Sequence, residues 1–295
     1  MPQQWQGRSR ARPLGYRIMV FVARNLGIGM SYFILRFVAF HYLIFSRDST
    51  RVVYELLRHR LHKTWWRAVI GTYRNYYIFA QTLLDKVVVM AGIDNKLSYE
   101  FDGEENLREI VRRGKGGILL SAHVGNWEAA GHLLKRLHTR VNVVMFDGEQ
   151  QQIKDYLESV TGRRNLNVIL VKPDLSHVYA MGEALQNNEL ICLHADRFLE
   201  GNKTVKRSFL GEDASFPLGP FILAASFKAP VSLVFAFKVT HVHYHFYGSS
   251  ILQCGDLETK AEFRERLLTA FVEALDQKVK MYPEQWFNYF NFWAK

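Results

Sequence analysis

The stretch Ile118–Leu134, ILLSAHVGNWEAAGHLL, decides how the rest of the chain can fold. It opens with a short apolar run directly after the glycine-rich turn Gly114–Gly117. Apolar runs of this length between turn signals are typical of buried strands. Beyond Gly125 the apolar side chains recur at helical spacing. We therefore expect a strand, a turn and a helix, with His123 where the strand ends and Glu128 in the first turn of the helix.

His123 and Glu128 are the first candidates for chemistry. In α/β folds ligands bind at the carboxyl ends of strands, and a histidine held there by a carboxylate is a general base with an orienting group. A tight turn between the two is reasonable, because Gly125 accepts positive φ and Asn126 tolerates it. The alternative is structural: a satisfied core histidine, followed by a glutamate favoured by the helix dipole. The pair alone leaves both interpretations open.

Strand and helix patterns alternate through the rest of the chain, which predicts an α/β fold with a mainly parallel sheet flanked by helices. A long helical pattern precedes them at residues 50–92, and its aromatic stripe is most simply core packing. Expected strands are 99–102, 118–122, 142–146, 168–171, 190–193 and 231–239, and expected helices are 103–113, 173–187, 217–229 and 263–281.

The positive charge is concentrated at the N-terminus. The chain of 295 residues has a formal charge of +10, but residues 1–75 hold 13 Lys and Arg against 2 Asp and Glu, whereas the remainder is close to neutral. Basic residues flank an apolar stretch at residues 18–45, which reads as a membrane-associating segment. Arg36 near its middle is costly inside lipid, so we expect an interfacial helix with snorkelling arginines. A single span is the alternative.

Residues 1–48 are therefore expected to form the basic and apolar membrane-associating segment, and residues 49–295 the catalytic domain. Nucleic acid is a weaker explanation of the charge, because no nucleic-acid motif is present and residues 76–295 are near neutral. The two cysteines do not suggest a disulfide framework. The sequence also lacks the glycine-rich loops of nucleotide sites and the Gly-x-Ser-x-Gly elbow of serine hydrolases.

The alternating histidines His241, His243 and His245 are a candidate metal site. They would share one face of a strand, but no cysteine or carboxylate is spaced along the sequence to complete a tetrahedral site. We therefore expect no metal and no bound cofactor.

The string His-Val-Gly-Asn-Trp-Glu at residues 123–128 resembles the His-x4-Asp/Glu motif of glycerolipid acyltransferases. It is most similar to the branch that acylates lipid A and mannosylated phosphatidylinositol. Three further blocks follow in that branch's order: His194–Arg197, Phe209–Pro220 and Tyr282–Phe287. The opening residues 4–17 and the ending 286–293 look more like acyltransferases of aryl-polyene and related pigment-lipid clusters.

The resemblance implies an acyltransferase at the cytoplasmic face of a bacterial inner membrane, peripheral or with a single span. The donor would be an acyl thioester on acyl carrier protein or coenzyme A, and the acceptor a hydroxyl of a membrane lipid or glycolipid. His123 would be the base and Glu128 its orienting partner. The acyl chain would need an apolar groove, and the sequence offers these aromatic residues for it: Trp127, Phe198, Phe209, Phe216, Phe221 and the stripe from Trp65 to Phe79. The expected substrate-binding residues are Asn126, Arg163, Asp196 and Arg197. A catalytically silent lipid-binding or scaffold protein on the same fold is the alternative.

Overall fold

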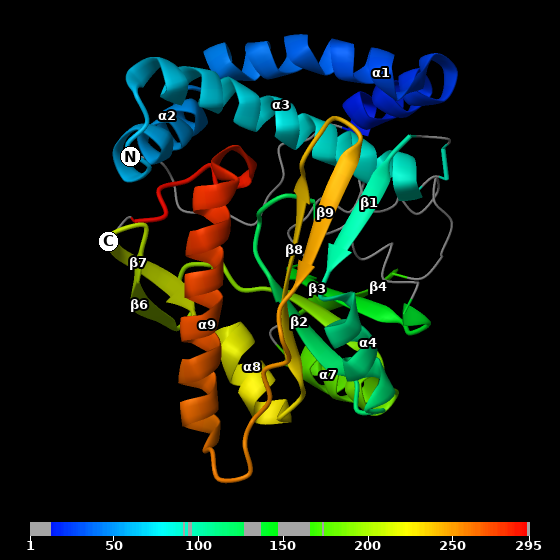
Figure 1. Cartoon of the computed structure of the whole chain (residues 1–295), viewed down its shortest axis with the longest axis vertical. Coiled ribbons are helices and arrows are strands. Elements are labelled where there is room, and N and C mark those ends of the chain that lie inside the picture. The colour runs from blue at the N-terminus through cyan, green and yellow to red at the C-terminus, as the bar shows by residue number, and fades with distance from the viewer. Residues whose placement is uncertain are drawn as a thin grey trace.

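The protein is described by a computed structural model covering residues 13–90, 92–93, 96–126, 137–146, 166–172 and 174–293. Its centre is a sheet of seven strands in the order β1-β9-β8-β2-β5-β3-β4 (Figure 1). Five neighbouring strands are parallel, and β9 with β1 runs the opposite way at one edge. The strands are β1 (Ser98–Asp102), β2 (Gly117–Ser121), β3 (Val141–Phe146), β4 (Leu166–Val171), β5 (Leu190–His194), β8 (Val231–Lys238) and β9 (His243–Gly248).

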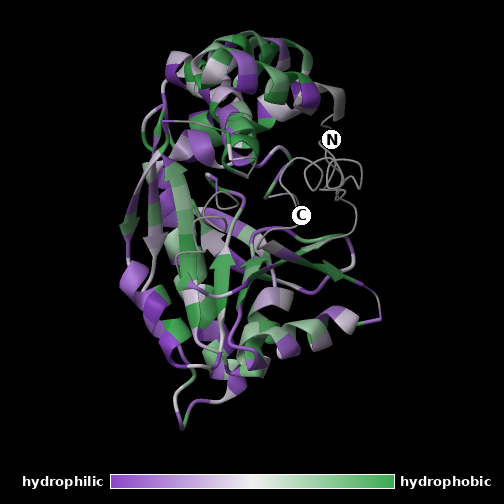
Figure 2. Ribbon diagram, turned by 90° about the vertical axis from the view of Figure 1, so that its right-hand side faces the viewer, coloured by the Kyte–Doolittle hydropathy of each residue, from purple (hydrophilic) through white to green (hydrophobic). Residues whose placement is uncertain are grey.

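Helices cover both faces of this sheet because the strand side chains alternate between two cores. Ile118 and Leu120 of β2 pack in a large cluster with three helices: α7 (Ser176–Gln186), α8 (Gly219–Phe227) and α9 (Lys260–Met281). Leu119 faces the opposite side and packs in a second cluster with α4 (Glu104–Arg112). In Figure 2 the central strands are accordingly mostly apolar.

A layer of N-terminal helices lies across one end of the sheet (Figure 1). The layer consists of α1 (Pro13–Phe45), α2 (Arg47–Glu55), a π-helical segment η1 (Leu56–Arg60) and α3 (Trp65–Met90). Helix α1 contacts α3 through a small cluster that includes Ala23, Leu35 and Leu84. The backbone of α1 is kinked at Gly27, whose φ of 81° is outside the helical region.

The mainly parallel sheet flanked by helices is confirmed, and the strands and helices expected after residue 98 lie within a few residues of their predicted bounds. The exception is the helix expected after Gly125, which lies outside the described residues. Two features differ. The helical pattern at 50–92 is broken by the non-helical residues 61–64, so α3 begins at Trp65. An antiparallel hairpin, β6 (Thr204–Phe209) with β7 (Glu212–Pro217), occupies a segment for which no strands were predicted. A 3-10 turn, η3 (Pro283–Gln285), follows α9.

Candidate active site

The candidate site lies at the carboxyl ends of two neighbouring strands, β2 and β5. Their parallel register pairs Ser121 with His194. Two residues further along each strand come His123 and Asp196, so the register places them opposite each other. Nδ1 of His123 lies 2.7 Å from Oδ1 of Asp196, and the backbone N–H of His123 donates to Oδ2 at 2.9 Å. One carboxylate therefore fixes both the imidazole ring and the backbone that carries it.

The burial of the pair differs between its two members. The Asp196 side chain is 1% exposed, whereas the His123 side chain is 23% exposed. The ring of His194 stacks on that of His123, with centroids 4.2 Å apart and an interplanar angle of 27°. The imidazole of His123 is thus held from two sides and still reaches the protein surface.

The turn after His123 requires glycine at position 125. Gly125 has a φ of 61°, and a Cβ there would lie 1.7 Å from the carbonyl oxygen of Ala236 on β8. A side chain is therefore excluded by contact with backbone as well as by conformation. The Asn126 N–H donates to that same Ala236 oxygen at 2.8 Å. The turn is consequently packed directly against the neighbouring strand.

The C-terminal segment after α9 holds the other side of the turn. Phe287 N–H donates to the carbonyl of His123 at 3.0 Å, and Gly125 N–H donates to the carbonyl of Gln285 at 2.8 Å. The Gln285 side chain bonds both backbone groups of Lys238, at 2.9 Å and 2.8 Å. In the sequence, the segment at 282–287 carries a family resemblance but no predicted structural role. Its position shows that it is a clamp for the turn at residues 123–126.

The electrostatics of the site favour an ionised Asp196. Burial opposes ionisation of this carboxyl, but His123 and then Arg197 outweigh it, so the pKa of Asp196 lies well below its usual range. Burial also lowers the pKa of His194 well below its usual value, and the neighbouring His123 lowers it further. At neutral pH the site therefore presents an anionic Asp196 and a neutral His194 on either side of the His123 ring.

His123, His194 and Asp196 could also be considered as metal ligands, since their donor atoms all lie within 4.8 Å of one another. Two imidazoles and a carboxylate suit several divalent metals. Against that use, Nδ1 of His123 is hydrogen-bonded to Asp196, and the two rings are stacked face to face. The geometry suits proton transfer by an oriented imidazole better than coordination of an ion.

The remaining predicted site residues have mixed outcomes. Glu128 and Arg163 lie outside the described residues. Asn126 is 4% exposed, and its amide donates to the carbonyl of Thr82 on α3 at 3.1 Å and to the Tyr244 hydroxyl at 3.3 Å. The guanidinium of Arg197 donates to the carbonyl of Phe287. Asn126 and Arg197 thus tie the turn at residues 123–126 and the C-terminal segment to the body of the protein, and their predicted contacts with substrate stay predictions.

Part of the prediction of an acyl-chain groove is wrong. Phe209, Phe216 and Phe221 were expected to line it, but each is at most 1% exposed. Phe209 packs edge-on against Trp286, with ring centroids 5.4 Å apart, and Phe216 against Phe292 at 5.5 Å. These rings form the core beneath the C-terminal segment, because that segment folds back over the hairpin β6–β7. Their aromatic content alone could not distinguish a groove from a core.

Sequence reasoning attached no role to His194 and none to Gln285. Their positions become meaningful only in the folded chain. His194 ends β5, the strand beside β2, and Gln285 precedes Trp286, whose backbone forms an isolated β-bridge with Val124. Such relations become visible only when the strand order is known.

Most of the chain is similar in sequence to known proteins. Residues 72–295 match the family described as bacterial lipid A biosynthesis acyltransferase. The chain is 26% identical over 200 residues, 65% of its length, to a phosphatidylinositol mannoside acyltransferase of Mycobacterium tuberculosis (strain ATCC 25618 / H37Rv). It is 24% identical over 185 residues to the protein of that name from Mycolicibacterium smegmatis, covering 62% of this chain and 58% of that relative.

The chain spans about 60% of the length of the M. tuberculosis relative. A solved structure, the 1-acyl-sn-glycerophosphate acyltransferase PlsC from Thermotoga maritima, aligns with a TM-score of 0.37 and 14% identity, covering 85% of this chain and 98% of that one. The family match extends over about three quarters of the sequence. It includes β2, the turn at residues 123–126 and the C-terminal clamp at residues 282–287. The chain therefore belongs to the bacterial lipid A biosynthesis acyltransferase family.

Proposed function

We propose that this protein is a membrane-associated acyltransferase that moves a fatty acyl group from a thioester to a hydroxyl of a lipid or glycolipid. The observation that carries the proposal is the His123–Asp196 pair at the carboxyl end of β2, 2.7 Å apart and reaching the surface through His123. A histidine oriented by a buried carboxylate is the arrangement needed to activate a hydroxyl. Family membership supplies the reaction class, and the pair supplies the base.

The reaction needs no covalent enzyme intermediate. With Nδ1 of His123 committed to Asp196, Nε2 would take the proton of the acceptor hydroxyl as its oxygen attacks the thioester carbonyl. The tetrahedral intermediate then collapses: the carbon–sulfur bond breaks, and the thiolate receives the proton from the imidazolium. An ester and a free thiol result, so atoms and charge balance. Asp196 stabilises the imidazolium between the two transfers.

Asp196 takes in this proposal the orienting role that the motif assigns to Glu128. Glu128 would then be available for a different task, such as holding the acceptor hydroxyl. Arg163 and Arg197 remain the candidates for phosphate groups of the acceptor or the donor arm. Asn126 acts through the shape of the turn. The donor is acyl carrier protein or coenzyme A, and a basic N-terminal region would attract the acidic carrier protein.

The N-terminal helices supply the membrane face. Among the described residues one helix, Arg17–Phe45, is long and apolar enough to cross a bilayer. Large apolar side chains are exposed along α1 and at the start of α3. More than half of the surface of these side chains is accessible: Ile18, Phe21, Leu26, Phe33, Phe37, Phe40, Phe45 and Trp65. Slightly less than half is accessible for Trp66, Val69 and Ile70. Exposed aromatic and aliphatic residues beside arginines are typical of helices that lie in a lipid interface.

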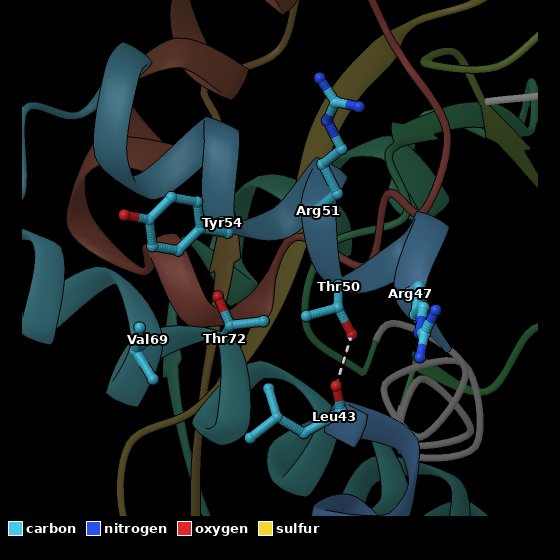
Figure 3. A pocket seen from close by; sticks show the side chains of 7 residues that line it. All are labelled: Leu43, Arg47, Thr50, Arg51, Tyr54, Val69 and Thr72. Carbon is cyan, nitrogen blue, oxygen red and sulfur yellow. Dashed lines mark hydrogen bonds between the residues drawn. The ribbon is translucent and has the colours of Figure 1, made fainter. Parts of the chain in front are cut away.

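A pocket of about 390 Å³ opens where α1, α2 and α3 meet (Figure 3). Leu43 and Val69 contribute apolar lining, and Arg47 and Arg51 stand at α2 beside it. The Thr50 hydroxyl inside it donates to the carbonyl of Leu43 at 3.1 Å. Apolar walls next to the Arg47 guanidinium suit the glycerol region and phosphate of a phospholipid, which supports the assignment of this side of the helices to the membrane. The Arg51 guanidinium is paired with Glu55.

The test is a comparison of total lipids from cells with the protein, without it, and with His123→Ala. We expect one or more lipids to gain a single acyl group only with the active protein. The missing species is then assayed as acceptor with palmitoyl carrier protein and with palmitoyl-coenzyme A. If the changed lipids differ by anything other than one acyl group, the proposal is wrong. Normal lipids with His123→Ala would eliminate the proposed base.

The second candidate, a catalytically silent lipid-binding protein, makes a different prediction. It would bind vesicles without consuming either thioester, and its effect in cells would survive His123→Ala. The ionised Asp196 held against His123 favours the enzyme, because a silent protein has no use for a buried carboxylate aimed at an accessible imidazole.

A further inference from the structure

A second polar cluster is enclosed where the N-terminal helices meet the sheet. It combines Tyr32 of α1, Asp85 of α3, Lys238 at the end of β8 and Tyr244 of β9. All four are buried, and Asp85 and Tyr244 have no exposed surface. Four elements that are distant in the sequence therefore meet at one carboxylate.

The hydrogen bonds of this cluster form a complete set. Asp85 accepts from the hydroxyls of Tyr32 and Tyr244 and from the ammonium of Lys238. The same ammonium donates to the Tyr32 oxygen at 2.8 Å. It also lies 4.7 Å from the centre of the Tyr32 ring and 4.9 Å from that of Tyr244. Each buried polar group of the cluster is thus matched, which fixes the relative positions of α1, α3, β8 and β9.

The cluster continues into the turn that carries the candidate base. Asn126, three residues after His123, donates its amide to the Tyr244 hydroxyl at 3.3 Å and to the carbonyl of Thr82 at 3.1 Å. Thr82 is one turn before Asp85 on α3. Lys238 enters from the other side, because its backbone is bonded to Gln285 of the C-terminal clamp. Two chains of contacts therefore lead from Asp85 to the turn at residues 123–126.

We propose that Asp85, with Tyr32, Lys238 and Tyr244, is a positioning cluster that couples the seating of the membrane-facing helix α1 to the placement of His123. None of these residues touches the reacting atoms. They act through Asn126 and Gln285, which set the backbone of the turn. The inference rests on the proposed function only for its effect on kcat. Its effect on hydrogen exchange at residues 123–126 does not depend on that function.

The geometry gives a reason for a charged pair at this place. Apolar side chains would fill the same space, but they would allow α1 and α3 to slide against the sheet ends. A carboxylate shared by two hydroxyls and an ammonium accepts one arrangement. Buried polar clusters specify position in this way in several proteins. Because a displacement of about 1 Å at reacting groups can cost about 100-fold in rate, small shifts of the turn are sufficient to be measured.

The test uses the full-length protein in anionic vesicles and the variants Tyr244→Phe and Tyr32→Phe, which remove one hydroxyl each and keep the ring. Ser232→Ala is the matched control: it also removes one buried hydroxyl, which donates to the carbonyl of Ser249 at 3.0 Å near the start of β8, away from the turn at residues 123–126. Hydrogen exchange of the peptide containing residues 123–126 is followed together with kcat and KM for palmitoyl-coenzyme A, with lipid extract from cells lacking the protein as acceptor.

We expect faster exchange at the turn and a fall in kcat of about 10-fold for Tyr244→Phe, with KM for the donor unchanged. Tyr32→Phe should give a smaller loss of the same kind, although Tyr32 is on a different helix. The double variant should lose less than the product of the two single effects, because both act through one carboxylate. Ser232→Ala should leave exchange at the turn and kcat as in the wild type.

The inference is overturned if wild type is active and both cluster variants keep its kcat and its exchange at the turn. It is also overturned if Ser232→Ala loses kcat as much as they do, since the loss would then be general destabilisation. If the wild type itself transfers no acyl group, the proposed function fails instead. Exchange at the turn then still decides whether the cluster positions it.

Discussion

Asp196 and Asp85 are both buried beside a basic side chain, yet their surroundings suit them to different roles. Asp196 is 1% exposed and holds His123, which is 23% exposed, whereas Asp85 and Lys238 are 0% and 3% exposed. Asp196 sits at the open end of the parallel strands, with one partner able to meet a substrate. Asp85 is surrounded by two tyrosines and a lysine that never leave the interior. A buried carboxylate supports catalysis only where its partner reaches solvent.

The comparison also concerns energy. A buried ion pair is weak evidence for stability, because desolvation offsets the attraction, but removing one partner leaves the other charge uncompensated. Asp196 should therefore matter most for rate, and Asp85 most for folding and for the geometry of the turn. The experiments below separate these effects, beginning with the largest.

Substitution of His123 by Ala should have the largest effect on rate. General base catalysis contributes about 10²–10⁴-fold, so acyl transfer should fall by that factor. The protein should stay folded with some loss of unfolding free energy, because buried Asp196 loses its imidazole partner but keeps the backbone N–H of residue 123. Turnover is measured with palmitoyl-coenzyme A and lipid extract, and stability by urea unfolding. Near wild-type turnover would show that the base is another residue.

Substitution of Asp85 by Asn should have the largest effect on stability. It leaves the ammonium of Lys238 buried without a countercharge, which costs about 3–5 kcal/mol in comparable sites. The double change Asp85→Leu with Lys238→Met removes both charges and should recover much of the loss in urea unfolding. If the single variant is as stable as the wild type, the pair is not the closed cluster described here.

Asp196→Asn should lower the rate of acyl transfer. Asparagine cannot stabilise the imidazolium that forms when His123 takes the acceptor proton, so kcat should fall while the protein stays folded. Ser232→Ala serves as the control, because its hydroxyl bonds the carbonyl of Ser249 near the start of β8, away from the turn. Wild-type kcat in Asp196→Asn would separate Asp196 from the base and would return the orienting role to Glu128.

The same variant should reveal a smaller, pH-dependent effect on stability. The pKa of Asp196 is lowered in the folded protein, whereas an unfolded aspartate titrates near about 3.9. Its contribution is therefore fully present above that pH and is lost as pH falls through the folded pKa. The difference in unfolding free energy between wild type and Asp196→Asn should shrink below about pH 4. A constant difference down to pH 2 would contradict the depressed pKa.

Chelation should have the smallest effect. If the cluster of His123, His194 and Asp196 works by proton transfer, prolonged treatment with EDTA followed by gel filtration leaves turnover unchanged. If activity is lost and Zn²⁺ or Mn²⁺ restores it, the site is a metal centre. The distinction drawn above between Asp196 and Asp85 would then no longer hold.

Local patterns predicted the elements of the sheet well because each signal lies inside its own element. The apolar run before His123 and the change to helical spacing after Gly125 identify a strand end without knowledge of its neighbours. Patterns failed where packing is remote. Phe209 and Phe216 resembled groove residues until the C-terminal segment was seen to cover them. The hairpin β6–β7 was missed because its strands carry mixed polar residues with exposed positions.

By itself the sequence determined the α/β class, the place of His123 at a strand end and the basic, apolar character of the N-terminal region, because these depend on periodicity and composition over neighbouring residues. Only the tertiary structure decided the partners. Asp196 reaches His123 across 73 positions through the register of β2 with β5, and Lys238 reaches Asp85 across 153 through the docking of α3 on the sheet. Such contacts follow from strand order and helix seating, which no local pattern encodes.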